Sequence, residues 1–520
     1  MSADVGVEYT GDIVFSDTGS GNYVFNGSGS GTGYEIEISG NLSGTLNETL
    51  NFVGSNGAGK EDFAYRITGN NSTLSRTQSG TIFGNNGAFL RTGHLILDNA
   101  NALGLGNNFN FGLGQNNSNY IGSTVGLYAT DGNDVSGDIY ILDNSRAAGS
   151  RTGRVTVGLD GAGEVEFSGN IGLAGISDNN RNLNNLHLTA DSGSRVNFSG
   201  QIFDSTSTTP MKVALIIEGG GTVAFSHGDN TYGGTGTYDS FGGTSITADT
   251  TLLVNGGEDN LTTSGTGTGM VRVGYKAVST TADTTSGSAI VTVASTEGLQ
   301  VGQAVSGTGI EAGTTISRIN TVTTPGGVIN TIQLSKQATA SGSDISFDAA
   351  ATTGILGGTG RIRPGDANSI IVASGSSIAA GDGGIGTLTF DGGDTTANLL
   401  TMESGSIFSF DLGAGNASDE IALWNYVVGD LGLNNNIVNF EGAQEGSYTL
   451  FSFYSDSGST MTASGIADGL VIGTGLDGFA YTLNYNTNSI TLDVVPEPSV
   501  AGLLMGTCVG LLCLRRKKRA

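Results

Sequence analysis

The chain has 520 residues but very little proline and cysteine, and each shortage excludes a class of protein. Proline occurs five times against 88 glycines, which excludes a collagen-like chain and a proline-rich disordered one. The two cysteines, Cys508 and Cys513, both lie in the C-terminal tail, so no disulfide and no cysteine-based zinc site can form in the body. The glycine content also disfavours helices, because each glycine inside a helix costs about 1 kcal/mol relative to alanine.

Charge is sparse, and positive charge is the scarcer kind. Charged residues make up 13% of the chain, and five of its 21 Lys and Arg residues lie in the final six positions, which leaves 16 against 47 Asp and Glu. Such an acidic body repels phosphate backbones and anionic membrane surfaces, so we expect no nucleic-acid partner. With 37% hydrophobic residues and so little charge, the composition predicts an ordered fold rather than a disordered chain.

Residues that carry enzyme chemistry are few and scattered. Glycan-cleaving sites need clustered carboxylates, a base and often Ca²⁺. The body holds only four lysines and three histidines, which are Lys60, Lys212, Lys276, Lys336, His94, His187 and His227. Because no Asp, Glu or His cluster adjoins any of these histidines in the sequence, we expect surface histidines rather than catalytic bases.

Two further segments resemble ligand loops only superficially. The segment DGNDVSGD at 131–138 lacks the spacing of an EF-hand or of a Ca²⁺-binding glycine-rich repeat, so surface turns account for its carboxylates. The segment GSGSGTG at 27–33 has no following Lys-Ser/Thr and is no phosphate loop. We therefore predict no catalytic residue, no cofactor-binding residue, no metal ligand and no cofactor.

What the sequence does contain is a loose repeat of short apolar strands and Gly/Asn/Asp turns. GEVEFSGNI at 163–171 and SRVNFSGQI at 194–202 share V-x-F-S-G-x-I at a spacing of 31 residues, and GTVAFSHGDNTYGG at 221–234 repeats the core 27 residues later. Weaker copies occur at 11–16, 93–107 and 137–144. Val and Phe, two apart, point to one face of a strand. The pattern predicts an all-β right-handed parallel β-helix, or solenoid.

The third copy carries a resemblance to a known family. GTVAFSHGDNTYGG followed by GTSITADTTLLVNGG at 243–257 resembles the autotransporter-associated β-strand repeat, with TGTYDSF at 235–241 as an extra turn between its halves. GILGGTGRI at 354–362 and SSIAAGDGGIGTLTFDG at 376–392 resemble that family's closing coils. The resemblance implies a β-helical body exposed at the cell surface.

Changes of pattern divide the chain into five parts. We expect solenoid repeats at 1–275, an inserted small β-module at 276–350, where AIVTV alternates strictly, and closing coils at 351–397. Fuller apolar runs and more aromatics at 398–495 predict antiparallel strands that cap the open end of the solenoid. Within them SDEIALWNYVV at 418–428 could form a short helix, but its Ile, Val and Tyr favour a strand.

The tail at 496–520 has a three-part order. The motif Pro496, Glu497 and Pro498 precedes an uncharged run from Ser499 to Leu514, and a basic end follows, made of Arg515, Arg516, Lys517, Lys518 and Arg519. Sixteen helical residues span about 24 Å, somewhat short of a bilayer core of about 30 Å, which suits a transient transmembrane helix with its basic end in the cytoplasm.

This order resembles the PEP-CTERM sorting signal of Gram-negative bacteria. The resemblance implies an exosortase, a sorting protease, as partner, and a precursor held in the inner membrane before release to the cell envelope, surface or extracellular matrix. An ordinary anchor that is never cut is the alternative. The sequence around Met1 shows no secretory signal, so we expect the coding sequence to begin further upstream.

The function expected from these features is that of a non-catalytic, exported structural or adhesive protein, with an extracellular polysaccharide as one candidate partner; the sequence does not identify the ligand. Two alternatives stay open: a polysaccharide-active β-helix enzyme, and a passenger-like autotransporter fragment.

Overall fold

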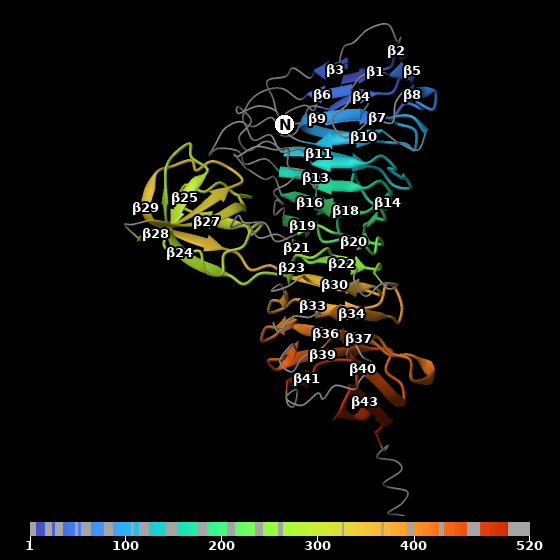
Figure 1. Ribbon diagram of the computed structural model, residues 1–520, viewed down its shortest axis with the longest axis vertical. Coiled ribbons are helices and arrows are strands. Elements are labelled where there is room, and N and C mark those ends of the chain that lie inside the picture. Colours follow the sequence, from blue (N-terminus) through green and yellow to red (C-terminus); the bar gives the residue numbers. More distant parts are fainter. Residues whose placement is uncertain are drawn as a thin grey trace, which may run out of the picture.

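The computed structural model describes residues 7–15, 23–26, 35–46, 50–53, 64–76, 87–105, 109–113, 124–141, 154–173, 185–204, 214–233, 243–257, 264–324, 327–365, 369–392, 399–425, 431–454 and 469–497. These residues form an all-β molecule built on a parallel β-solenoid of about 11 turns, with a smaller β-module beside it (Figure 1). The helical content of the described residues is the single 3₁₀ turn η2 (Ala414–Asn416).

The solenoid has three faces, and each strand pairs with the equivalent strand of the next turn. Face 1 is a continuous parallel ladder of β1 (Val7–Tyr9), β4 (Glu35–Ile38), β7 (Ala64–Ile67), the second half of β9 (Gly87–Leu97), β11 (Thr124–Ala129), β13 (Arg154–Leu159), β16 (Leu186–Thr189), β19 (Ala214–Glu218), β21 (Gly243–Ile246), β23 (Met270–Val273), β32 (Ile370–Val372), β35 (Leu400–Met402) and β38 (Leu431–Gly432).

Face 2 consists of two parallel sheets. One contains β2 (Ile13–Phe15), β5 (Leu42–Leu46) and β8 (Leu74–Arg76). The other contains β14 (Glu164–Phe167), β17 (Arg195–Phe198), β20 (Thr222–Phe225), β22 (Thr250–Val254), β30 (Gly354–Gly358), β33 (Ser377–Ala380), β36 (Ile407–Asp411), β39 (Asn436–Glu441) and β41 (Leu470–Ile472).

Face 3 also has two parts. The first holds β3 (Tyr23–Asn26), β6 (Leu50–Val53), the first half of β9, β10 (Asn110–Leu113), β12 (Ile139–Ile141), β15 (Ile171–Leu173) and β18 (Ile202–Asp204). The second holds β31 (Arg361–Ile362), β34 (Thr387–Asp391), β37 (Glu420–Trp424), β40 (Gly446–Tyr454), β43 (Ser489–Pro496) and β42 (Phe479–Tyr485).

The V-x-F-S-G-x-I repeat aligns as the sequence predicted. Val165 pairs with Val196, and Val196 pairs with Val223, on adjacent rungs of face 2. The same one-turn step is 29 residues from Val7 to Ile36, so a turn of this solenoid takes about as many residues as the repeat does. The weaker copies do not all belong to this register, because 93–97 lies on face 1 and 139–141 on face 3. Short apolar strands look alike whichever face they build.

Stacked apolar side chains make up the core. On face 2 one inward column runs from turn to turn through Val165, Val196, Val223, Leu252, Leu356, Ile378, Phe408 and Val438, and all are buried. The Phe167 and Phe198 rings beside it stack with centroids 5.2 Å apart. Each buried side chain of this kind contributes about 1.5–3 kcal/mol, and the stacking explains why period-two alternation was the main sequence signal.

The N-T-Y portion of the third repeat has a structural role. The Asn230 side chain is buried at a corner, where its Oδ1 accepts the Ile202 amide at 2.7 Å and its Nδ2 donates to the Gly265 carbonyl at 2.7 Å. The fully buried Tyr232 hydroxyl lies 2.7 Å from Thr244 Oγ1. The motif therefore links three successive turns. The extra residues expected as a lengthened turn at 235–241 lie outside the described residues.

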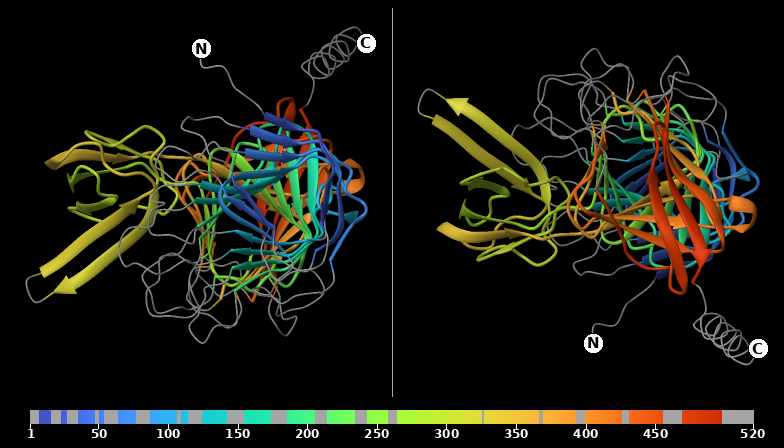
Figure 2. Two further views of the ribbon diagram at one scale, coloured as in Figure 1. Left: turned by 90° about the horizontal axis from the view of Figure 1, so that it is seen from above. Right: turned by 90° about the horizontal axis from the view of Figure 1, so that it is seen from below.

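A six-stranded antiparallel sheet interrupts the solenoid between two consecutive turns. It contains β24 (Val278–Thr284), β25 (Ile290–Val293), β26 (Val305–Gly307), β27 (Ile316–Thr324), β28 (Gly327–Leu334) and β29 (Gly342–Ala349), in the order β26-β29-β24-β25-β28-β27. On either side of it the ladders continue unbroken, because β23 pairs with β32 and β22 pairs with β30. We call this sheet and its loops the inserted module; it has its own apolar core, and Figure 2 shows it projecting from one side of the solenoid.

The prediction of antiparallel strands throughout 398–495 is wrong for most of that segment. Strands β35 to β40 continue the parallel ladders of the three faces. Among the described residues of this segment, the antiparallel pairs are β40 with β43, β43 with β42 and the isolated bridge of Leu412 with Ser418. Alternating apolar residues determine which side chains face the core, but they do not determine the direction of the neighbouring strand. The segment at 420–424 is a strand, as its residue types favoured.

Most of the tail lies outside the described residues. Pro496 ends β43 and Glu497 follows it, whereas Pro498, the run from Ser499 to Leu514 and the basic end at 515–519 are not among the residues described. Within the part of the chain that the structure describes, no helix is long and apolar enough to cross a bilayer.

Candidate binding groove

The inserted module leans on face 1, and a groove forms where the two meet. Ile216, on the outer side of β19, packs against Val301 of the module. The Tyr275 hydroxyl donates to the Val301 carbonyl at 2.8 Å, and Asn185 Nδ2 donates to the Ser317 carbonyl at 3.1 Å. These contacts hold the module against the solenoid.

The groove has a volume of about 680 Å³ and is lined mainly by polar groups. Its floor is the outer surface of β9, β11, β13, β16 and β19, and its rim is made by the turns that follow those strands and β21. The wall comes from two segments of the inserted module, around Thr315 and Lys336. Strand alternation produces this floor, since every second residue of a solenoid strand points outward.

Two glycines in the middle of strands let neighbouring groups lie close to the floor. Gly126 pairs with Thr156, and Tyr128 pairs with Gly158, so each glycine stands beside a larger outward side chain. A Cβ on Gly158 would lie 2.4 Å from the Thr189 carbonyl oxygen, and one on Gly126 would lie 2.4 Å from the Tyr128 ring. Glycine inside a strand costs stability and often marks a place of close approach.

Arg154, His187 and Glu218 form a charged cluster in and beneath this floor. Glu218 Oε1 accepts hydrogen bonds from Arg154 Nη2 and, at 3.1 Å, from His187 Nδ1. Burial lowers the pKa of the His187 imidazole well below its usual value, and the Arg154 charge lowers it further. The ring is therefore neutral, although its distance from Glu218 alone would suit an ion pair. Burial also lowers the pKa of Arg154.

The expectation that all three histidines are surface residues is wrong for His187, which is 5% exposed. The absence of a nearby acid in the sequence was equally misleading, because Glu218 lies 31 residues further along, one turn of the solenoid. His94 lines the groove on β9, three rungs from His187. His227 lies after β20, where its Nδ1 accepts the Asp229 amide at 3.1 Å.

Tyr128 is the aromatic residue of the groove. Its ring lies 5.2 Å from that of His94, centroid to centroid, at an interplanar angle of 54°. Burial raises the pKa of the Tyr128 phenol, so the hydroxyl keeps its proton at neutral pH and can donate a hydrogen bond.

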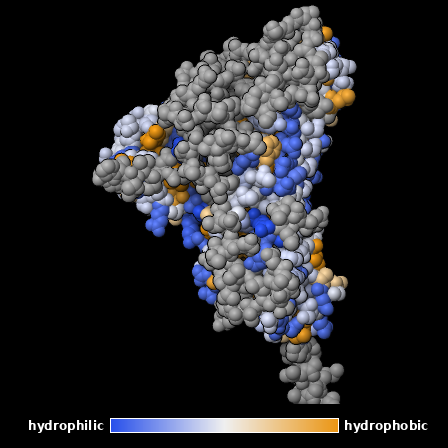
Figure 3. Space-filling view, viewed as in Figure 1, coloured by the Kyte–Doolittle hydropathy of each residue, from blue (hydrophilic) through white to orange (hydrophobic). Residues whose placement is uncertain are grey.

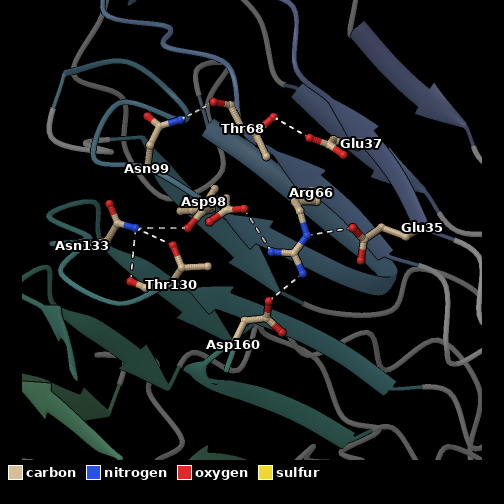
Figure 4. Close-up of polar contacts among 10 residues, drawn as sticks. Glu35, Glu37, Arg66, Thr68, Asp98, Asn99, Thr130, Asn133 and Asp160 are labelled. Carbon is tan, nitrogen blue, oxygen red and sulfur yellow. Dashed lines mark hydrogen bonds and ion pairs between the residues drawn. The ribbon is translucent and has the colours of Figure 1, made fainter. Parts of the chain in front are cut away.

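Arg66 closes one end of the groove through Asp160. Its guanidinium binds Glu35 at 2.7 Å, Asp98 at 3.2 Å and Asp160 at 2.7 Å, and Figure 4 shows the three carboxylates around it. Burial alone would lower the pKa of Arg66, but the hydrogen bonds that it donates to Glu35 and Asp160 raise the pKa above its usual value. This arginine links side chains over five rungs of face 1, from β4 to the turn after β13.

On the opposite wall, Lys336 Nζ lies 2.7 Å from Glu311 Oε1 and donates to the Ala312 carbonyl at 3.1 Å. Thr315 and Ser335 are linked by two hydrogen bonds of 2.8 Å, from the Thr315 amide to Ser335 Oγ and from the Ser335 amide to the Thr315 carbonyl. The wall thus presents one ammonium group and two hydroxyl-bearing side chains on a fixed hairpin base.

The carboxylates at 131–138 act in turns, as the sequence indicated. Asp131 accepts the Glu164 amide and Asp138 accepts the Asn170 amide, both at 2.8 Å and both from the next turn. Among the described residues, no group of three or more His, Cys, Asp or Glu side chains is placed to bind a metal ion. Lys276 pairs with Glu403 at 2.7 Å, while Lys60 and Lys212 lie outside the described residues.

The sorting motif begins at an exposed position. Pro496 and Glu497 are both exposed, and the Glu497 amide donates to the Gly478 carbonyl at 3.2 Å. In Figure 1 β43 lies at the opposite end of the solenoid from β1.

The chain matches no protein-family model and no curated protein.

Proposed function

We propose that the protein is an exported, non-catalytic structural or adhesive component of the cell surface or extracellular matrix, sorted by an exosortase through its tail. The observation that carries the proposal is the order of the tail: Pro-Glu-Pro, then an uncharged run, then five basic residues. The exposed start of this motif at the end of a rod supports it, because a protease must reach the chain there.

Three finer features of the fold belong to the same proposal. They are a right-handed coil, as the geometry of parallel crossovers favours, a capping role for the antiparallel strands β40, β43 and β42, and a transmembrane helix from Ser499 to Leu514. The cap would cover the last turn of the core, and the helix would hold the precursor in the inner membrane until the chain is cut near Pro496.

The groove chemistry supports a binding role over a catalytic one. Glu218 is bound by Arg154 and His187, and Asp160 is bound by Arg66. These two carboxylates therefore serve as partners of cationic or hydrogen-bonding side chains within the fold. The polysaccharide-active enzyme and the autotransporter fragment remain the alternatives that experiment must separate from this proposal.

The test uses a Gram-negative host that contains an exosortase, with the chain expressed behind a secretion signal. We expect the wild-type protein to lose its tail and to reach the envelope or medium, as measured by mass spectrometry of fractionated cells. Replacing Pro496, Glu497 and Pro498 by alanine should leave a membrane-bound precursor of full mass, and deleting the exosortase should have the same effect.

The control is Pro364→Ala, which removes a proline from the body and should be processed normally. The sorting proposal is wrong if the triple-alanine protein is processed like the wild type, or if the tail persists in a strain with the exosortase.

A further inference from the structure

We propose that the groove between face 1 and the inserted module binds a neutral glycan chain. This inference rests on the proposed function, since an extracellular location is where a glycan ligand would be met. It adds the site, the residues and the chemical class of ligand.

The shape of the groove suits an extended ligand. Its floor crosses five consecutive rungs, β9 to β19, and five strands about 4.8 Å apart span about 19 Å. Gly126 leaves room for the Tyr128 ring, which lies over that glycine and so forms part of the floor that a ligand would contact. A groove of this length and volume accommodates several linked sugar rings rather than a single small molecule.

Paired donors and acceptors suit the hydroxyl groups of a sugar. The lining offers hydrogen-bond donors on two cationic side chains, Arg154 and Lys336. It offers acceptors on three carboxylates, which are Asp160, Asp191 and Glu218. Two hydroxyl groups, those of Thr189 and Tyr128, can donate and accept. Arg154 donates from Nη2 to Glu218 and from Nε to Thr156. These two hydrogen bonds involve two of the five N–H groups of a guanidinium. A sugar hydroxyl, which donates and accepts at once, can bridge such a pair without breaking it.

The charges of the lining exclude an acidic polymer as the ligand. Three carboxylates face the groove against the two cations of Arg154 and Lys336, and Glu218 and Glu311 already pair with those two. A uronic acid chain would find neither Arg154 nor Lys336 without a carboxylate partner, and the net charge of −26 on the whole chain would repel it from a distance.

Tyr128 supplies the apolar part of the interaction. An aromatic ring with a polar tip packs against the C–H groups of a sugar while its hydroxyl stays hydrogen-bonded. The Tyr128 ring packs against the His94 ring and lies over Gly126, where a side chain would collide with it. The ring is therefore already fixed before binding, and little of its conformational freedom is lost when a ligand binds.

The test measures binding of the purified protein to defined probes. We use neutral hexasaccharides of β-linked glucose, β-linked N-acetylglucosamine and α-linked mannose, with a galacturonic acid hexamer as the acidic comparator, in isothermal titration calorimetry. At least one neutral probe should bind, and Tyr128→Ala and Lys336→Met should each weaken that binding about tenfold or more.

Two matched variants serve as controls. Tyr481→Ala removes a tyrosine that is 47% exposed on β42, and Lys276→Met removes a lysine that also sits 2.7 Å from a glutamate. Both should keep the affinity within about twofold, and circular dichroism confirms that all four variants are folded.

The proposal is overturned if no neutral probe binds, if the acidic hexamer binds better than every neutral one, or if the groove variants bind like their controls. Mass spectrometry of the recovered probes tests the non-catalytic proposal separately, because an enzyme would return shortened sugars. Tail processing is independent of both, so each failure can be assigned to its own proposal.

Discussion

At the scale of single residues, the cluster of Arg154, His187 and Glu218 shows how burial and charge act together. A protonated imidazole at His187 would place two cations on one carboxylate inside the solenoid wall, so the neutral form prevails. In that form the ring donates from Nδ1 to Glu218, and the arginine supplies the compensating charge. Of the three side chains, the His187 imidazole is the most buried, and Arg154 and Glu218 reach the groove.

A pH dependence of stability follows from the lowered pKa of His187. Below about pH 6.5 the unfolded chain takes up a proton that the native imidazole refuses, so this group's contribution to stability falls as the pH falls. The slope is at most about 1.4 kcal/mol per pH unit in that range. His187→Gln keeps an N–H donor for Glu218 but cannot titrate. We expect the melting temperature of the variant to fall less than that of the wild type when the pH is lowered from 7.5 to 5.

Both proteins are compared by thermal unfolding in matched buffers, and their difference should be constant above about pH 7.5. If the wild type gains stability relative to His187→Gln on acidification, then the imidazole is protonated in the native state and the assignment of a neutral ring is wrong.

At the scale of elements, the chain leaves the solenoid and returns to it at one pair of facing residues. Tyr275 and Thr352 form an antiparallel bridge, with the Tyr275 amide donating to the Thr352 carbonyl at 2.8 Å and the Thr352 amide donating back at 3.1 Å. The two chain crossings therefore lie side by side, and the ladders on either side pair directly. A solenoid tolerates such an excursion because each turn contacts only its neighbours.

This geometry predicts that the module can be removed. Replacing residues 276–351 by Asn-Gly joins the bridged pair through a two-residue turn of the kind that closes a β-hairpin. The shortened protein should keep its far-UV circular dichroism and melt within about 5 °C of the full chain, and it should lose the glycan affinity proposed for the groove.

Removal also uncovers Ile216, which packs on Val301 in the full chain. A second version with Ile216→Thr therefore separates loss of the fold from simple aggregation through an exposed apolar side chain. The interpretation of the module as an independent excursion fails if both versions lack a cooperative unfolding transition.

At the scale of the whole molecule, the surface is acidic and has few large apolar patches. The described exposed hydrophobic side chains, such as Val14 and Leu105, are scattered over the rod, and the face in Figure 3 is mainly polar where it is coloured. Carboxylates also repeat along the ladders, as Glu8 pairs directly with Glu37 on face 1. Like charges placed opposite one another destabilise a sheet.

Salt should therefore stabilise this protein. Raising NaCl from about 10 mM to 150 mM shortens the Debye length from about 30 Å to about 8 Å, which screens the repulsion of a chain with net charge −26. We expect the melting temperature to rise by a few degrees. KCl at the same concentrations should act equally, since the effect is ionic screening rather than binding of one cation. A fall in melting temperature would instead show that ion pairs such as those of Arg66 dominate.

Much of the fold was predictable from the sequence because a solenoid uses the same local pattern on every turn. The V-x-F-S-G-x-I copies specify both the inward side chains and the length of a turn, and Val165, Val196 and Val223 stack as that spacing requires. The direction of the strands after Leu400 was not predictable, because alternation is the same in parallel and antiparallel sheets. The charge and residue order of the tail are likewise properties of the sequence.

Only the tertiary structure decided where the candidate site lies. Arg154, His187 and Glu218 are far apart along the chain, and each looks like an ordinary polar residue of an outward strand position. Coiling places them on adjacent rungs, since a separation of 31 residues, as between His187 and Glu218, is one turn. The wall of the groove depends on the inserted module, whose position against face 1 rests on a few contacts such as Ile216 with Val301. No local pattern encodes a contact between two units that fold around separate cores.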